Sequence, residues 1–208
     1  MVLHSFYFLL LSIIFILNRM KTLLSKGMTL FICLFISFSL YAGDKASFLK
    51  RQFTSSNGYK LNYRILYPLN YSPDKSYPVI LFLHGAGERG NDNEAQLVHG
   101  GNMFASYDNQ SKYPAIIIAP QCPEGESWAN YKHPKDNNNK REFPAAAGIT
   151  PAMSAVKEML DTYISKGIVD TKRIYVTGLS MGGMGTFDAV CRFPNFFAAA
   201  APICGGAN

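Results

Sequence analysis

The feature that most constrains the fold is residues 173–192, RIYVTGLSMGGMGTFDAVCR, where a short apolar run leads directly into a glycine-rich turn and then a helical pattern. Ile174, Tyr175 and Val176 have the β-branched and aromatic character of a buried strand. The next five residues, GLSMG, fit the pattern G-x-S-x-G. A strand, a sharp turn and a helix in this order predict a nucleophile elbow, which would lift the hydroxyl of Ser180 clear of a sheet.

The glycines of this stretch fit the tight geometry of an elbow. At Gly178 and Gly182, which flank the serine, a side chain would collide with the strand or the helix. Gly183 and Gly185 would let the helix lie close to the strands. The N–H of Met181, in the first helical turn, lacks an intrahelical partner and would point toward a developing oxyanion. The competing interpretation is an ordinary turn before a core helix, but the strand and helix patterns on either side favour the elbow.

A second glycine-rich segment, HGAGERG, follows an apolar run at residues 78–83 that is typical of a strand covered on both faces. Its letters fit the dinucleotide-binding pattern G-x-G-x-x-G, with Asp108 in the place of a ribose-binding acid. They also fit an oxyanion loop whose second donor is the N–H of Ala86. We favour the oxyanion loop because it supplies a partner that Ser180 requires. We expect His84 to pack and hydrogen-bond the loop and not to act as the base.

The N-terminal part of the chain has the pattern of an export signal. From Met20 the sequence runs through two lysines, an apolar core at residues 28–40 and small residues ending at Ala42. We therefore expect residues 1–42 to be an upstream segment plus a signal peptide, with Met20 as the true start, and residues 43–208 to form the domain. The apolar core is shorter than the roughly 20 residues that a spanning helix needs, which argues against an uncleaved anchor.

The charge balance does not favour nucleic acid as a partner. The chain carries 20 basic and 14 acidic residues, and because three of the basic residues precede position 43, the net charge falls from +6 to +3 after the predicted cleavage. No basic stripe with interleaved aromatics is present. We expect a secreted or periplasmic protein that meets the membrane only through its signal peptide during export. Cys122, Cys191 and Cys204 fit no zinc motif and are expected to pack as small apolar residues. We expect no metal and no other cofactor.

The remaining patterns predict an α/β fold, with a mostly parallel, doubly wound sheet and an antiparallel hairpin at its N-terminal end. Asn57-Gly58 between two extended segments is the hairpin signal. Thr150-Pro151 is a typical helix start, and Gly167 a typical helix end. The apolar strands are expected at residues 78–83, 113–120, 174–176 and 196–204.

A long polar segment at residues 121–148 separates two of these elements. Loops of this length are usually functional or disordered. Because it follows a strand at the carboxyl end of the predicted sheet, it would cover a substrate site, with Trp128 as a stacking wall. The alternative is that Trp128 only anchors its own loop.

Four segments together, FLHGAGERGNDN, APQCPEGESW, GLSMGGMGT and FAAAAPICGG, resemble a known family. It consists of secreted bacterial α/β-hydrolase esterases grouped with predicted peptidases, polyhydroxybutyrate-depolymerase-like and feruloyl-esterase-like proteins. The resemblance covers roughly residues 45–208 and implies the α/β-hydrolase fold. It also implies a serine hydrolase that cleaves carboxylic esters through an acyl-enzyme on Ser180, with the N–H groups of Ala86 and Met181 as oxyanion donors. The implied substrates are small-molecule or polysaccharide-linked acyl esters. A prolyl-oligopeptidase-like peptidase is the alternative, and a non-catalytic binding module the third interpretation.

The chain departs from this family pattern after the serine. The family places an acid and then a histidine after the nucleophile, but the 28 residues that follow Ser180 contain Asp188 as their only carboxylate and no histidine. Asp188 falls within the predicted helix, where a structural role is expected, and His99 and His133 precede the serine. We therefore interpret the chain as the N-terminal part of a hydrolase domain, without its last strands, its acid and its histidine. On its own it is expected to be nearly inactive and to expose an apolar sheet edge.

Overall fold

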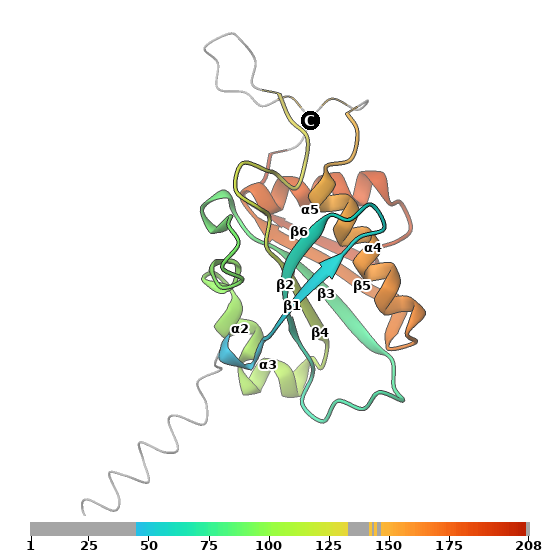
Figure 1. Cartoon of the computed structure of the whole chain (residues 1–208). Coiled ribbons are helices and arrows are strands. Elements are labelled where there is room, and N and C mark those ends of the chain that lie inside the picture. The colour runs from blue at the N-terminus through green and yellow to red at the C-terminus, as the bar shows by residue number, and fades with distance from the viewer. Residues whose placement is uncertain (1–44, 133–141, 143, 145–146, 207–208) are drawn as a thin grey trace, which may run out of the picture. The chain divides into compact units, whose positions relative to one another are not determined.

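The computed structural model of the chain describes residues 45–132, 142, 144 and 147–206 (Figure 1). The predicted upstream segment and signal peptide lie outside the described residues, and so does His133. Among the described residues, no helix is both long enough and apolar enough to cross a membrane.

The described part begins with the predicted hairpin. β1 (Leu49–Thr54) pairs antiparallel with β2 (Lys60–Leu66). Gly58 adopts a φ of 85°, which glycine tolerates and which closes the turn, and the N–H of Ser55 donates to the carbonyl of Tyr59 at 2.9 Å. The Asn-Gly pair therefore marks the hairpin as predicted.

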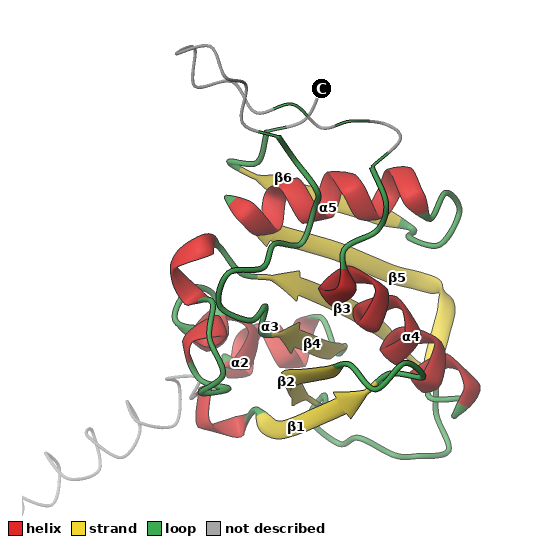
Figure 2. Cartoon of the chain, turned by 45° about the horizontal axis from the view of Figure 1, so that its top comes forward, coloured by secondary structure: helices red, strands yellow, loops and turns green. Residues whose placement is uncertain are grey.

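One six-stranded sheet organises the domain, with the order β1-β2-β4-β3-β5-β6 (Figure 2). β2 pairs antiparallel with β4, whereas the remaining pairs, β4 with β3, β3 with β5 and β5 with β6, are parallel. The four further strands are β3 (Tyr77–Leu83), β4 (Ile116–Pro120), β5 (Val169–Leu179) and β6 (Ala199–Ile203). The predicted sheet, mostly parallel with an antiparallel hairpin, is confirmed, although β4 and β6 are shorter than the apolar runs that predicted them.

Helices pack on both faces of the sheet. α4 (Pro151–Ser165) begins where the Thr150 hydroxyl accepts from the N–H of Met153 at 3.1 Å. α4 and α5 (Met181–Arg192) pack against one face of the sheet (Figure 2). The opposite face carries short helices: η1 (Lys45–Ser47), η2 (Ala86–Glu88), η3 (Ala95–Leu97), α2 (Gly101–Ala105) and α3 (Tyr107–Lys112).

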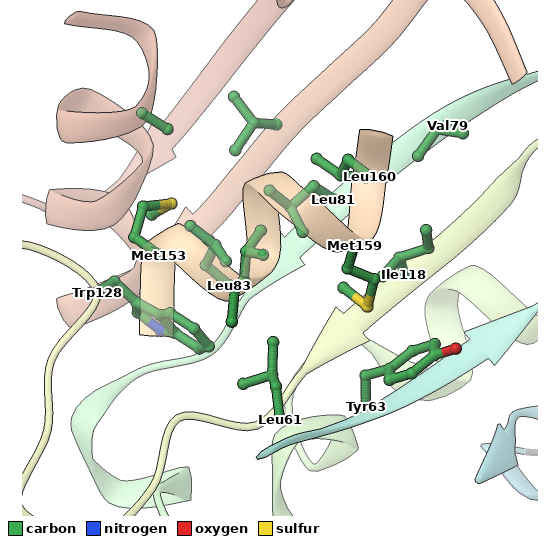
Figure 3. Packing of buried hydrophobic residues seen from close by; sticks show 14 of the residues in the cluster. Leu61, Tyr63, Val79, Leu81, Leu83, Ile118, Trp128, Met153, Met159 and Leu160 are labelled. Atoms are coloured by element: carbon green, nitrogen blue, oxygen red, sulfur yellow. The ribbon is translucent and has the colours of Figure 1, made fainter. Parts of the chain in front are cut away.

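The core follows from the alternation of side chains along the strands. In β3, Leu81 and Leu83 face the larger cluster beneath α4 and α5, while Phe82 faces the smaller cluster on the other side. Figure 3 shows Met153 and Met159 of α4 packed over the strands in the larger cluster. Full burial of each such side chain contributes about 1.5–3 kcal/mol, so the ends of β3 and β5 form a firm base for the loops that follow them.

β6 is one of the two edge strands of the described sheet and, like β1, it is largely exposed. It pairs with β5 on one side, and four of its five residues are exposed, with Ile203 half exposed. The exposed edge that the sequence predicted is therefore present among the described residues.

Candidate active site

Ser180 lies between the end of β5 and the start of α5. Its backbone has φ 54° and ψ −111°, outside the regions that a non-glycine residue normally adopts, and its side chain is exposed. Such a conformation costs of order 1–3 kcal/mol and persists only where its surroundings impose it. The N–H of Ser180 donates to the carbonyl of Ile203 at 2.8 Å, which fixes the turn against β6. The predicted strand, sharp turn and helix are all present.

The glycines around Ser180 are required by close backbone contacts. A Cβ atom on Gly178 would lie 2.5 Å from the carbonyl oxygen of Gly182 and 2.6 Å from that of Leu83. A Cβ atom on Gly182 would overlap the carbonyl oxygen of Leu83 outright. A Cβ atom on Gly185 would overlap the Cβ of Trp128. Helix α5 can therefore approach β3 only because these positions lack side chains, as predicted.

The predicted oxyanion loop leaves the sheet beside this turn. Leu83, the last residue of β3, pairs in register with Gly178 of β5, so the two strands end next to each other. A Cβ on Gly85 would lie 3.0 Å from Leu179 Cδ1, which places the loop against the residue that precedes the serine. Ala86 then opens the 3₁₀ helix η2 and is exposed.

Two backbone N–H groups near the adjacent ends of β3 and β5 have no partner among the described residues. Met181 is the first residue of α5, where an N–H has no partner within the helix. Neither the N–H of Met181 nor that of Ala86 hydrogen-bonds to any residue in the described part of the chain. The segments that follow the adjacent ends of β3 and β5 thus each carry one unpaired donor, at the two positions where the sequence predicted oxyanion donors.

His84 is a buried structural residue, as predicted. Its Nε2 accepts the N–H of Cys122 at 2.9 Å, so the ring proton must be on Nδ1, which donates to the carbonyl of Gly85 at 2.6 Å. Burial lowers the pKa of His84 to about 4. The imidazole is therefore neutral near pH 7 and has both nitrogens occupied, which leaves it no role as a base.

Trp128 does not line an open site, and the prediction of a stacking wall is wrong. The side chain is fully buried in the larger core cluster. Its indole N–H donates to the carbonyl of His84 at 3.0 Å, and its ring meets the His84 ring edge-on at 5.2 Å. Burying so large an apolar ring against α5 is more favourable than leaving it exposed to solvent. Trp128 therefore anchors its own loop, which was the alternative interpretation.

The other charged candidates do not contact the serine. Asp188 accepts from Arg192 Nε at 2.7 Å within α5, which confirms its predicted structural role. His99 is exposed, with Nε2 3.5 Å from Glu88 Oε1. Within the described ranges, no histidine or carboxylate is hydrogen-bonded to Ser180.

The dinucleotide interpretation lacks its structural context. That fingerprint requires a strand, a glycine-rich turn and a helix that begins at the turn. Here the loop after β3 bends through the single turn of η2 and then through irregular backbone. Asp108 is exposed in the first turn of the separate helix α3.

The cysteines only partly fit the expectation of small packed residues. The three in the described part of the chain are unpaired. Cys122 is buried, and burial raises the pKa of its thiol to about 12. Cys191 and Cys204 are exposed, because they lie on the outer side of α5 and just after the edge strand β6, so for them the expectation is wrong.

Sequence reasoning missed Arg64, a buried arginine that supports the segment after the oxyanion loop. Its Nε donates to the carbonyl of Asn93 at 2.6 Å and its Nη1 to the carbonyl of Phe48 at 2.7 Å, while Nη2 contacts Glu94. A basic residue in a strand normally indicates a solvent-facing position. Tyr63 and Ile65 lie on the opposite face of the strand, and only Leu66, two residues further on, hints that the face of Arg64 is also covered.

The sheet order, the strained serine turn and the adjacent glycine-rich loop define the α/β-hydrolase fold. The chain belongs to the Esterase family, whose match covers residues 54–207. It is similar to the crystal structure of a thermostable esterase, with 39% identity and a TM-score of 0.67 over 78% of this chain and 42% of that one. A solved ferulic acid esterase shares the fold, with 20% identity and a TM-score of 0.55 over 76% of this chain and 60% of that one.

Two curated relatives are similar to part of this chain. The poly(3-hydroxyalkanoate) depolymerase C of Paucimonas lemoignei is 28% identical over 62% of this chain and 28% of its own length. The bifunctional acetylxylan esterase/xylanase of Neocallimastix patriciarum is 26% identical over 68% of this chain and 17% of its own length. The chain thus spans less than a third of the length of these two relatives.

Proposed function

We propose that this chain supplies the nucleophile and the oxyanion site of a serine hydrolase that cleaves carboxylic esters. The observation that carries the proposal is the exposed Ser180 on a strained turn, together with the unpaired N–H groups of the adjacent Met181 and of Ala86, whose loop lies against Leu179. Membership of the Esterase family supports it.

The proposed reaction has two acyl transfers. Ser180 Oγ attacks the ester carbonyl carbon as its proton passes to a base, and the carbonyl oxygen becomes an oxyanion held by the two N–H groups. The intermediate expels the alcohol, which takes that proton, and leaves an acyl-enzyme. Water then attacks the same carbon, which releases the carboxylic acid and restores the serine hydroxyl. Each oxyanion donor is worth about 3 kcal/mol in such reactions.

The base and its orienting acid are proposed to come from residues that follow position 208 in the complete protein. Two findings support this: no described histidine contacts Ser180, and this chain covers 42% of the thermostable esterase that it resembles. Without the histidine, the chain by itself is expected to lose several orders of magnitude in rate. The mature domain would accordingly begin near residue 43 and extend past this chain.

Acyl esters, free or attached to a polysaccharide, are the proposed substrates. The names acetylxylan esterase and ferulic acid esterase among the relatives and solved structures support this class. A secreted or periplasmic location is proposed from the signal-like residues that precede the domain. Nucleic acid is not a proposed partner.

The test uses protein expressed from its complete coding region. Hydrolysis of 4-nitrophenyl acetate, acetylated xylan and methyl ferulate is measured beside a panel of chromogenic peptides, and a fluorophosphonate probe is used to label the serine. We expect ester turnover and labelling, both reduced at least about 10³-fold by Ser180→Ala. Turnover of peptides alone would replace the esterase proposal with a peptidase. Full activity of Ser180→Ala would overturn the nucleophile assignment.

A further inference from the structure

The residue directly after β4 holds the oxyanion loop from outside. Gln121 is almost fully buried, and its side-chain amide bonds to Glu88 within the loop and to Asp92 and Asn93 just after it. Its Nε2 donates to the carbonyl of Glu88 at 3.3 Å and to Asp92 Oδ1 at 2.7 Å, and its Oε1 accepts the N–H of Asn93 at 2.7 Å. Both amide hydrogens are therefore used.

The next residue along the chain, Cys122, adds two bonds, one on each side of Ala86. The N–H of Cys122 donates to His84 Nε2, before the loop, and its carbonyl accepts the N–H of Gly90 at 3.0 Å, after the loop. We call Gln121 and Cys122 together the clamp. The clamp brackets the segment from His84 to Gly90 at both ends.

The loop needs such support because its own structure is weak. Its only regular element is the single turn of η2, closed by one bond of 3.4 Å from the N–H of Glu88 to the carbonyl of Gly85. Isolated turns of this kind are marginal, and three glycines in seven residues increase the number of conformations open to the free chain. An oxyanion donor acts only if it is fixed before the charge develops. The N–H of Ala86 must therefore be fixed by contacts from elsewhere.

We propose that Gln121 is a positioning residue of the reaction: its amide fixes the loop so that the N–H of Ala86 is held next to Ser180. The proposal rests on the function proposed above. Glutamine suits this place, because one end of its amide donates to the Glu88 carbonyl and the Asp92 carboxylate while the other accepts. A glutamate would lose both donors and place a second carboxylate beside Asp92.

The surroundings of Asp92 agree with this role. The backbone N–H groups of Glu94 and Ala95, followed by the amide of Gln121, hold the pKa of Asp92 below its usual value. Asp92 therefore remains an anionic acceptor for Gln121 near neutral pH, and the bond between them is charge-assisted.

Gln96 offers a matched control within the same region. It is equally buried and its Nε2 donates to Asn93 Oδ1 at 2.6 Å. It has no hydrogen bond to the segment from His84 to Gly90. Substituting either glutamine would disturb the local packing, whereas only the substitution of Gln121 should displace the loop.

The experiment compares Gln121→Leu and Gln96→Leu in protein expressed from the complete coding region, with 4-nitrophenyl acetate as substrate. We expect Gln121→Leu to lower kcat by about 10- to 100-fold with KM changed less than about threefold, since a misplaced donor weakens the transition state more than substrate binding. Gln96→Leu should lower Tm and leave kcat within about twofold. Gln121→Glu, which keeps the acceptor, should lose kcat like Gln121→Leu.

Wild-type kcat in a folded Gln121→Leu or Gln121→Glu variant, or an equal loss of kcat in Gln96→Leu, would overturn the proposal. The esterase proposal fails separately, through full activity of Ser180→Ala. Amide hydrogen exchange can be measured on the unsubstituted protein, so this test does not depend on a variant that folds. The amides of Gly90 and Asn93 should be protected from exchange, and the amide of Ala86 should exchange rapidly. Exchange of Gly90 and Asn93 at the rate of a free loop would also overturn the proposal.

Discussion

The serine turn and the oxyanion loop lie side by side, yet they are held in place by different forces. The turn is held by close backbone packing, since α5 lies so near β3 that neither Gly178 nor Gly182 has room for a side chain. The loop is fixed by hydrogen bonds to a distant segment, chiefly from the side chain of Gln121 and from the N–H of Cys122 to the neutral ring of His84. The serine turn thus tolerates almost no added side-chain volume. The oxyanion loop instead depends on hydrogen bonds that a change in pH or a single substitution can remove.

The largest expected effect comes from adding a methyl group to the turn. Gly182→Ala would place a Cβ on the carbonyl oxygen of Leu83, and backbone on both sides cannot move aside, so we expect a loss of about 4 kcal/mol or more. In the loop, Gly87→Ala meets no atom within 4 Å and should change stability by less than about 1 kcal/mol. Thermal and urea unfolding measure both. Equal losses in the two variants would contradict the contrast between turn and loop.

The next effect concerns the loop and pH. The pKa of His84 in the folded protein is about 4, below its value near 6.5 in an unfolded chain. The unfolded state therefore binds the proton more tightly, and the stabilising contribution is complete above about pH 6.5 and declines as pH falls toward 4. Over that window we expect a loss of about 3 kcal/mol.

Urea unfolding from pH 8 to pH 4 measures this slope, with His84→Gln as the comparison. The variant removes the titrating ring, so its stability should depend less on pH between 6.5 and 4. The contribution of Asp92, whose pKa is lowered, is lost only below its usual range near 3.8 and falls outside this window. A pH profile of the unsubstituted protein that is flat down to pH 4 would show that His84 is not buried as described.

A smaller effect should reveal the strain at the nucleophile. Ser180 has φ 54°, which glycine adopts more readily than any residue with a Cβ. We expect Ser180→Gly to be more stable than Ser180→Ala by about 1 kcal/mol, because it relieves strain at some cost in the entropy of the unfolded chain. Differential scanning calorimetry of the two inactive variants gives the difference. A less stable glycine variant would mean that the turn is relaxed.

The smallest effect is kinetic and concerns the clamp. Cys191 and Cys204 are exposed and should react with iodoacetamide at pH 8, whereas Cys122 is buried, with the pKa of its thiol raised to about 12, and should not. Mass spectrometry of timed samples distinguishes the three sites. In Gln121→Leu, labelling of Cys122 should become measurable, and unchanged protection there would indicate that the clamp stays closed without the glutamine.

The same contrast explains what the sequence could predict. The elbow, the Asn57-Gly58 hairpin and the start of α4 at Thr150 depend on neighbouring residues, so local patterns were sufficient. The loop supports depend on contacts between distant segments. Gln121 stands in a polar stretch that resembles any loop, and Arg64 in a strand resembles a surface residue.

Trp128 shows the limit of reasoning from residue type. An aromatic residue in a long polar loop is compatible with a substrate wall and with an anchor. The choice between them depends on two distant residues: Gly185, which leaves room for the ring, and His84, whose carbonyl accepts the indole N–H. The roles of Ser180 as nucleophile and of Met181 and Ala86 as oxyanion donors remain predictions. The predicted signal segment lies outside the described residues.

The hydrogen bond from the N–H of Ser180 to the carbonyl of Ile203 ties the proposed nucleophile to an exposed edge strand of the sheet. A Cβ on Gly205, just beyond that strand, would overlap the backbone of Gly183 in α5, so the two segments touch without any intervening side chain. The position of the edge strand is therefore coupled directly to the position of Ser180. A partner or substitution that shifts β6 would therefore also shift the backbone of Ser180 and change the direction of its hydroxyl.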